Sequence, residues 1–390
     1  MNYKVFHPSK TVNCDIDLPS SKSISNRLLI IQALCEKSFK IINISNCDDS
    51  KSLRKALNFK ENIINIGYAG TAFRFLTSYL SVQSGKKFIL TGSDRIKKRP
   101  IKELVKVLRK IGARIEYMER EGFAPLKIIG TELEGGGVEI SGGISSQFIS
   151  SILLIAPTLK NGIELKIKGE LVSKSYLEMT LKLMREFGIK SSWKNNIIKI
   201  QSQNYLPIDY TVEADWSAAS FWFEIASLSE SCKIKLNGLN QNTIQGDIKA
   251  IEIFKHLGVN SKFENKKLIL TKNKDLNPQS SYDLLDNPDV YQALRCSLFG
   301  LNRSSDFVGI VTLKDKETNR IFSVSTELEK LHSSKIINTY KDHRMAMSFA
   351  PLCLRYGELQ INDAEVVTKS YPNFWKDLKK SGFIISVLSH

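Results

Sequence analysis

The chain has 390 residues, 42% of them apolar, and its 56 Lys and Arg against 40 Asp and Glu give a formal net charge of +16. This length exceeds what one hydrophobic core usually supports, so we expect two globular domains. The six cysteines form no CxxC pair and the five histidines no pair at metal-ligand spacing, which argues against disulfide, thiol and metal chemistry.

The N-terminus has no apolar signal-peptide region, and no uncharged apolar stretch reaches the ~18 residues of a membrane span. We therefore expect a cytoplasmic protein. The positive charge could serve nucleic acid, a membrane surface or small anions. Its lysines are dispersed, as at Lys266-Lys267 and Lys379-Lys380, rather than gathered in one basic tract. We expect no nucleic acid and no membrane as a partner, and small anionic substrates instead.

Six short polar or glycine clusters each precede an unusually apolar run, which predicts six buried helices. These runs begin near Ser23, Thr71, Ser146, Ser217, Asp289 and Asp342. Amphipathic helices are predicted between them, at 50–57, 100–111, 173–187, 245–257, 319–331 and 371–380. Short β-branched or alternating segments predict strands at 88–91, 163–167, 197–200, 233–236 and 268–270.

Three of the five intervals between the buried-helix starts agree closely, and the other two are shorter by about one hairpin of chain. This regularity predicts an α/β fold of six repeated βαβαββ-type units, two of them shortened. A chance regularity is the alternative, because helices alternate with strands in any α/β protein. Six units divide as three plus three, which predicts an N-terminal domain at 20–212 and a C-terminal domain made of 1–19 and 213–390. The strand before Pro19 would then pair with the C-terminal half.

The start near Ser23 is the clearest candidate for an anion site. Ser23 can cap the helix while the free N–H groups of the first turn face outward, and Arg27 follows one turn along the same face. Lys22 stands directly before the cap. Two cations and several N–H donors therefore converge on one anion; a capped helix with surface charges is the alternative.

Two further starts in the N-terminal half carry similar chemistry. Gly70 lets the backbone approach a ligand, and Arg74 follows within one turn. Ser145, Ser146 and Gln147 form a polar cap whose glutamine could hydrogen-bond a substrate hydroxyl. The loop before Pro100 adds four cations: Arg95, Lys97, Lys98 and Arg99. Ordinary capping turns and a solvated charge run are the alternatives.

In the C-terminal half, acids stand beside cations at helix starts. Asp289 follows Pro288, Lys316 and Glu317 precede Arg320, and Asp342 precedes Arg344. Carboxylates held near cations are suited to proton transfer with charge stabilisation. Surface ion pairs would give the same pattern.

The order and spacing of nine segments resemble one known family, the 5-enolpyruvylshikimate-3-phosphate synthases, or 3-phosphoshikimate 1-carboxyvinyltransferases. The segments are SKSISNR, AGTAFR, LTGSDRIKKRPI, SSQF, QGDI, PDV, KETNR, DHRMAM and KSYPNFW, and together they cover essentially the whole chain. The resemblance implies an inside-out α/β architecture of two domains that close on substrate, without a cofactor or a metal. We also expect a monomer.

The activity that the resemblance implies is transfer of the enolpyruvyl group of phosphoenolpyruvate to the 5-hydroxyl of shikimate 3-phosphate, with release of phosphate. This reaction belongs to the shikimate pathway to chorismate and the aromatic amino acids. The sister transferase that uses UDP-N-acetylglucosamine is one alternative, but it would call for a reactive cysteine in 92–99, which contain none. An inactive relative and an RNA-binding protein are the others.

The resemblance also implies roles for individual residues. Shikimate 3-phosphate would contact Lys22, Ser23, Arg27, Ser145, Ser146, Gln147, Ser173, Asp289 and Lys316. Phosphoenolpyruvate would contact Lys22, Gly70, Arg99, Gln147, Arg320, Arg344 and Lys369. Asp289 is favoured as the base that takes the hydroxyl proton, and Glu317 as the group that exchanges the C3 proton. The reverse assignment, or a role shared with Lys22, stays open.

Several positions depart from the family pattern. Tyr68 stands where asparagine is usual, Phe75 where proline is usual, and Asn319 where aspartate is usual, while Trp216 lies in an Asp-Ser-Ser region. The segments at 57–67 and 331–340 are shorter than in most relatives. The two shortened segments lie outside the segments that carry the chemistry.

Overall fold

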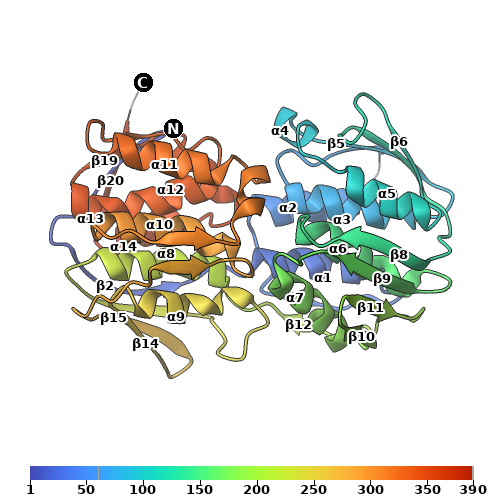
Figure 1. Cartoon of the computed structure of the whole chain (residues 1–390), viewed down its shortest axis with the longest axis horizontal. Helices are drawn as coiled ribbons and strands as arrows, with labels where there is room; N and C mark the ends of the chain where they lie inside the picture. Colours follow the sequence, from blue (N-terminus) through green and yellow to red (C-terminus); the bar gives the residue numbers. More distant parts are fainter. Residues whose placement is uncertain (60, 389–390) are drawn as a thin grey trace. The chain divides into compact units, whose positions relative to one another are not determined.

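The computed structural model describes residues 1–59 and 61–388, which form two compact units (Figure 1). The N-terminal unit is Lys22–Val212, and the C-terminal unit combines Met1–Ser21 with the chain from Glu213 onward. The fold is mixed α/β, with several small four-stranded sheets. Within the described residues, no helix is both long enough and apolar enough to cross a membrane.

The N-terminal unit contains the buried helices α1 (Lys22–Leu34), α3 (Gly70–Ser81) and α6 (Ser146–Ile155). Its other helices are α2 (Asp48–Leu57), α4 (Asp94–Lys97), α5 (Lys102–Lys110) and α7 (Lys174–Glu186). One sheet has the order β4 (Ile63–Asn65), β5 (Lys87–Thr91), β7 (Leu126–Ile129), β6 (Arg114–Tyr117). A second has the order β10 (Ser191–Lys194), β11 (Ile197–Ile200), β9 (Ile163–Lys168), β8 (Gly136–Ser141), and β12 (Tyr210–Thr211) pairs with β3 (Ile41–Ile42).

The C-terminal unit contains the buried helices α8 (Trp216–Leu228), α10 (Tyr291–Gly300) and α12 (His343–Phe349). Its other helices are α9 (Ala250–Lys255), α11 (Arg320–Lys330), α13 (Cys353–Tyr356) and α14 (Phe374–Lys380). One four-stranded sheet has the order β18 (Ile336–Ile337), β19 (Leu359–Ile361), β1 (Asn2–Phe6), β20 (Ile384–Leu388). Another has the order β14 (Val259–Glu264), β15 (Lys267–Lys272), β13 (Ser231–Asn237), β2 (Thr11–Asp17). A two-stranded sheet joins β16 (Ser281–Asp283) to β17 (Asp306–Val308).

The first two strands of the chain pair with strands of the C-terminal half, as predicted. β1 lies antiparallel between β19 and β20, with Tyr3 opposite Ile361 on one side and Val387 on the other. β2 runs parallel to β13, with Val12 opposite Cys232. The chain therefore begins in the C-terminal unit and returns to it near Glu213.

The structure corrects some helix boundaries. α1 begins at Lys22, so Ser23 lies within the first turn and does not stand before it as the cap. The predicted helix at 245–257 is divided into a 3-10 turn at Gly246–Lys249 and α9. Asp289 lies in a 3-10 turn, Pro288–Val290, directly before α10. Capping geometry and the first turn depend on local hydrogen bonds, so boundaries shift by a residue or two from the sequence pattern.

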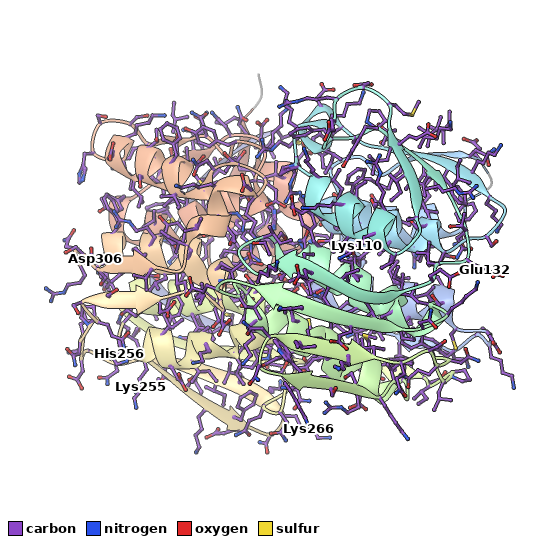
Figure 2. All side chains as sticks on the ribbon, turned by 45° about the vertical axis from the view of Figure 1, so that its right-hand side comes forward. Lys110, Glu132, Lys255, His256, Lys266 and Asp306 are labelled. Atoms are coloured by element: carbon purple, nitrogen blue, oxygen red, sulfur yellow. The ribbon has the colours of Figure 1, made fainter. Side chains whose placement is uncertain are left out.

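Exposed lysines are spread over separate elements of both units. Lys110 ends α5, Lys255 ends α9, and Lys266 lies between β14 and β15; all three are exposed, and Figure 2 shows Lys255 and Lys266 at the lower edge of the molecule. Other surface lysines pair with acids. Lys127 Nζ, for example, lies 3.0 Å from Glu116 Oε2 on the neighbouring strand. Such dispersed charge is typical of a solvated surface rather than of one basic tract.

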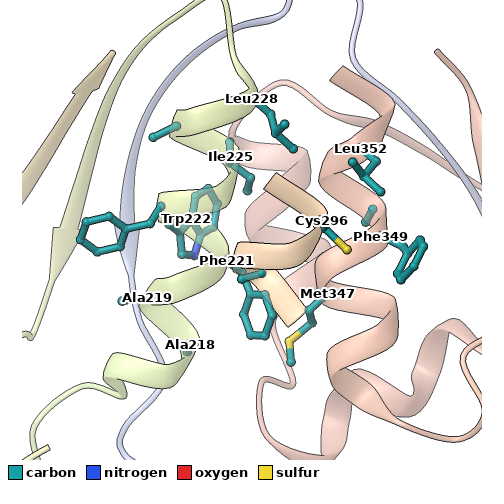
Figure 3. Packing of buried hydrophobic residues seen from close by; sticks show 14 of the residues in the cluster. Ala218, Ala219, Phe221, Trp222, Ile225, Leu228, Cys296, Met347, Phe349 and Leu352 are labelled. Atoms are coloured by element: carbon teal, nitrogen blue, oxygen red, sulfur yellow. The ribbon is translucent and has the colours of Figure 1, made fainter. Parts of the chain in front are cut away.

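The buried helices of each unit pack against one another and leave little of their length to water. Nearly every residue of α8 is buried, and Figure 3 shows its Phe221 on the side that faces Cys296 of α10 and Met347 of α12. A helix that is apolar all round is shielded along its sides. Its N-terminal end, with free N–H groups, is the part best placed to meet a polar ligand.

Glu224 is the exception to the apolar character of α8. Its side chain is fully buried, neither carboxyl oxygen has a hydrogen-bond partner among the described residues, and burial raises its pKa well above the ordinary value. The folded chain therefore keeps the Glu224 proton at pH values where the unfolded chain releases it. Between its unfolded and folded pKa values, each pH unit of increase lowers the free energy of unfolding by about 1.4 kcal/mol.

We expect Glu224→Gln to remove this pH dependence, because the amide carries no proton to lose. Relative to the wild type, the variant should gain melting temperature as the pH rises from about 4 to 8. Thermal melts at several pH values measure the difference, with Glu230→Gln, at an exposed position just beyond α8, as the control. A difference that does not grow with pH would contradict the prediction.

Candidate functional site

In the N-terminal unit, the start of α1 presents Arg27 in an unusual environment. Its side chain is 2% exposed and donates from Nε to Thr180 Oγ1 at 2.7 Å, from Nη2 to Ser150 Oγ at 3.2 Å and from Nη1 to Ser23 O at 2.9 Å. Burial lowers its pKa to about 10, so the guanidinium stays charged at neutral pH. Within the described residues, no carboxylate pairs with it. A buried cation held only by neutral oxygens is well suited to an anionic ligand.

Lys22 begins α1 and lies beside an acid of the neighbouring helix. Its Nζ is 3.5 Å from Oδ2 of Asp49, which is buried in the first turn of α2. The ammonium group is therefore held near the N-terminal end of α1 by a fixed carboxylate. The acidic first turn of α2 would ordinarily be attributed to the helix dipole, so the pattern alone did not identify Asp49 as a partner.

Gly70 begins α3 in contact with two arginines. A Cβ added at Gly70 would lie 2.2 Å from Arg99 Nη1 and 2.9 Å from Arg74 Nη1. Arg74 Nη1 also donates to the Gly70 carbonyl at 2.8 Å, and both guanidinium-bearing residues are buried. The missing side chain therefore gives room for two cations to approach the start of the helix.

The start of α6 forms the predicted polar cap. Ser145 Oγ accepts a hydrogen bond from the backbone nitrogen of Gln147 at 3.4 Å, and the side-chain Nε2 of Gln147 donates to Thr71 Oγ1 at 3.1 Å. Gln147 Oε1 is buried and has no hydrogen-bond partner in the part of the chain that the structure describes. This acceptor is available to a hydroxyl of a ligand.

Ser173, before α7, has a left-handed backbone, with φ 56° and ψ 43°, and is 4% exposed. Left-handed non-glycine residues cost free energy and are concentrated at ligand sites.

The predicted basic residues Arg95, Lys97 and Lys98 lie in α4 and at its C-terminal end. Lys97 Nζ pairs at 3.1 Å with an exposed glutamate, Glu119.

In the C-terminal unit, three carboxylates converge on Arg320, the first residue of α11. Its Nε donates to Asp342 Oδ2 at 2.8 Å, Nη1 to Asp289 Oδ1 at 3.1 Å, and Nη2 to Glu317 Oε2 at 2.8 Å. Burial acts to lower the pKa of Arg320, but the carboxylates outweigh it and hold the pKa above the ordinary value. Arg320 is therefore a permanent cation at the centre of this cluster.

Three other cations complete the C-terminal cluster. Arg344 donates from Nη2 to Asp289 Oδ2 at 2.9 Å and from Nη1 to the Asp289 carbonyl at 2.8 Å. Lys369 Nζ lies 2.9 Å from Glu317 Oε1, and Lys316 Nζ lies 3.9 Å from Asp289 Oδ1. Asp289 and Glu317, both partly exposed, thus each bridge more than one cation, and they can exchange protons with a ligand while charge is stabilised around them.

The sequence assigned no substrate or catalytic role to two acids of this unit, Asp342 and Asp247. Asp342 is fully buried, anchors Arg320 and accepts from the Arg344 amide nitrogen at 2.9 Å. Asp247, in the segment QGDI, accepts from Ser217 Oγ, and burial together with the Asp289 carboxylate raises its pKa to about 6. Asp247 had a sequence signal in its segment, whereas its proximity to Asp289 depends on the fold.

The sequence-predicted residues divide between the two units. The N-terminal unit carries Lys22, Ser23, Arg27, Gly70, Arg99, Ser145, Ser146, Gln147 and Ser173. The C-terminal cluster contains Asp289, Lys316, Glu317, Arg320, Arg344 and Lys369. Among the residues described, no group of three or more His, Cys, Asp or Glu side chains has the arrangement to hold a metal ion.

Two comparisons with known proteins identify the family, and a third shows a shared fold. Residues 51–378 match the family described as EPSP synthase (3-phosphoshikimate 1-carboxyvinyltransferase). A 3-phosphoshikimate 1-carboxyvinyltransferase of Bacteroides fragilis (strain YCH46) is 43% identical, covering 99% of this chain and 99% of the relative. One of Vibrio campbellii is 30% identical, covering 97% and 99%. The solved structure of EPSP synthase from Acinetobacter baumannii matches with a TM-score of 0.77 at 20% identity, covering 99% of this chain and all of that one, and shows the shared fold.

Proposed function

Because this chain belongs to the EPSP synthase (3-phosphoshikimate 1-carboxyvinyltransferase) family, we propose that it transfers the enolpyruvyl group of phosphoenolpyruvate to the 5-hydroxyl of shikimate 3-phosphate. The products are 5-enolpyruvylshikimate 3-phosphate and phosphate, on the shikimate pathway to the aromatic amino acids. The observation that carries the proposal is the 43% identity over 99% of both chains. The buried arginines of both units agree with it, because both substrates are phosphorylated carboxylates that need fixed cations.

The finer organisation is part of the same proposal. The domains are 20–212 and 1–19 with 213–390, each made of three α/β units in an inside-out arrangement, with two units shortened. The small four-stranded sheets of both units support a repeated architecture. The enzyme works in the cytoplasm as a monomer, without a cofactor, and closes its domains on the substrates.

Shikimate 3-phosphate is assigned to Lys22, Ser23, Arg27, Ser145, Ser146, Gln147, Ser173, Asp289 and Lys316. The support is strongest at Arg27, a buried cation bonded to neutral oxygens. Gln147 adds an acceptor that suits a ring hydroxyl. A ligand that carries both anionic and hydroxyl groups satisfies both features at once.

Phosphoenolpyruvate is assigned to Lys22, Gly70, Arg99, Gln147, Arg320, Arg344 and Lys369. Its phosphate and carboxylate repel those of the other substrate when the reacting atoms come within bonding distance. Cations held in place before the reaction offset that repulsion without reorganising. Arg320 and Arg344 are held in this way by Asp342 and Asp289.

The proposed reaction is an addition followed by an elimination. The 5-oxygen attacks C2 of phosphoenolpyruvate as a base takes the hydroxyl proton, and an acid adds a proton to C3. C3 then loses a proton, the C2–C3 double bond forms again, and the bond to phosphate breaks. We assign the base to Asp289 and the C3 proton exchange to Glu317, with Lys22 placed between the substrates; exchange of the first two roles is the alternative.

Mixing the purified protein with both substrates and measuring phosphate release tests this function. We expect release that depends on both substrates and falls strongly in Lys22→Ala. No release by the wild type would overturn the proposal. UDP-N-acetylglucosamine in place of shikimate 3-phosphate tests the sister activity, and release only with that sugar nucleotide would favour it instead.

Gly70→Ala is expected to raise the KM for phosphoenolpyruvate by at least about tenfold. The added methyl group would overlap Arg99 Nη1, so the guanidinium must move away from the start of α3. The KM for shikimate 3-phosphate should change less, because Arg27 lies on α1. Gly67→Ala is not a neutral control, since its φ is +58°; Gly137→Ala is, since nothing lies near an added Cβ there. Equal KM values for Gly70→Ala and wild type would contradict the prediction.

A further inference from the structure

An aromatic ring of α3 faces the buried guanidinium of α1. The Arg27 Cζ lies 5.6 Å from the centroid of the Phe75 ring, and the two residues are 2% and 1% exposed. Both belong to the N-terminal unit. A guanidinium over a ring face within ~6 Å is attracted by the quadrupole of the ring, most strongly where water is excluded.

We propose that Phe75 is a positioning residue for shikimate 3-phosphate, acting through the guanidinium of Arg27. This inference rests on the proposed function. The four acceptors of Arg27, Thr180 Oγ1, Ser150 Oγ, and the Ser23 and Tyr176 carbonyls, hold the edges of the guanidinium group. The Phe75 ring lies against the same group, with its centroid 5.6 Å from Cζ. Together these contacts restrict rotation of the guanidinium group. The side chain therefore loses less conformational entropy when the substrate binds.

An aromatic ring and a carboxylate both stabilise a buried arginine, but only the carboxylate cancels its positive charge. Arg320 is neutralised by three carboxylates, and an anionic ligand must compete with them. Arg27 has no such partner within the described chain, and the ring stabilises its charge without cancelling it. The buried cation therefore needs no carboxylate partner and keeps its full charge for the substrate.

The same arrangement recurs at two other helix starts. Arg74 of α3 lies 5.4 Å from the Phe148 ring of α6, and Arg344 of α12 lies 5.9 Å from the Phe221 ring of α8. Each pair lies within one unit. The pairing is thus a repeated way of holding an arginine near the start of a buried helix.

Direct binding of shikimate 3-phosphate, measured by calorimetry without phosphoenolpyruvate, is the test. Phe75→Leu removes the ring face and is expected to raise the dissociation constant about tenfold, the order of a desolvated cation–π contact. Phe187→Leu is the matched control, because Phe187 is a buried phenylalanine of the same unit whose ring contacts in the described chain are aromatic. It should leave the dissociation constant near the wild-type value.

A series of fluorinated phenylalanines at position 75 separates the electronic role from packing. Fluorine withdraws charge from the ring face while nearly keeping its shape, so affinity should fall stepwise from phenylalanine to the trifluoro analogue. This series also serves if Phe75→Leu fails to fold. The KM for phosphoenolpyruvate should stay nearly constant along the series.

The possible results distinguish failure of the role of Phe75 from failure of the proposed function. Unchanged affinity in Phe75→Leu, equal losses in Phe75→Leu and Phe187→Leu, or a flat fluorinated series would overturn the role of Phe75. A stepwise loss that disappears in an Arg27→Lys background would support it, because the ring then lacks the planar group that it positions. If the wild type does not bind shikimate 3-phosphate at all, the proposed function fails instead.

Discussion

Glu317→Gln is expected to lower kcat by about 10²–10⁴-fold, because the amide cannot exchange the C3 proton. The KM for phosphoenolpyruvate should not rise. The wild-type carboxylate lies 2.8 Å from Arg320 Nη2 and 2.9 Å from Lys369 Nζ. Without its negative charge, these two cations attract an anionic substrate more strongly. Initial rates of phosphate release measure both constants.

Exchange of the C3 protons in deuterated water assigns the role directly. The wild type, given both substrates, should incorporate deuterium into phosphoenolpyruvate, and Glu317→Gln should not. Asp289→Asn is the companion variant, since Asp289 holds Arg320 and Arg344 in a similar way. Exchange that survives in Glu317→Gln and disappears in Asp289→Asn would reverse the two roles.

Arg320→Met is expected to lower the free energy of unfolding by about 3–5 kcal/mol and to abolish turnover. Asp342 is fully buried and accepts from Arg320 at 2.8 Å, so the substitution leaves a buried carboxylate without that cation. Chemical denaturation measures the change in stability. Adding Asp342→Asn should restore much of the stability and none of the activity, because the loss of stability comes from the stranded charge.

The exposed pair of Lys127 and Glu116 provides the matched control for Arg320→Met. Lys127→Met removes an ion pair of similar length, 3.0 Å, but both side chains are well exposed. Its effect on the free energy of unfolding should be small, since solvent replaces the lost partner. If Arg320→Met were no more harmful than Lys127→Met, the buried network would not stabilise the fold in the way described.

Hydrophobic patterning predicted the buried helices well. All six apolar runs form helices in the structure, and the strands predicted at 88–91, 163–167 and 197–200 lie within β5, β9 and β11. A run that is apolar on every side can only be stable inside a core, so its position in the fold follows from composition. Helix starts were predicted less closely, and the start at Ser23 was off by one residue, because one hydrogen bond decides where the first turn begins.

The sequence by itself therefore determined the kinds of elements and the family to which the chain belongs. Motifs such as SKSISNR and DHRMAM are local, and local sequence is enough to identify them. The tertiary structure decided which groups meet: Thr180 lies 153 residues from Arg27, and Asp342 lies 22 residues from Arg320. Hydrogen bonds and ring contacts act over a few ångströms, and only the packing of the helices brings residues so distant in the chain within that range.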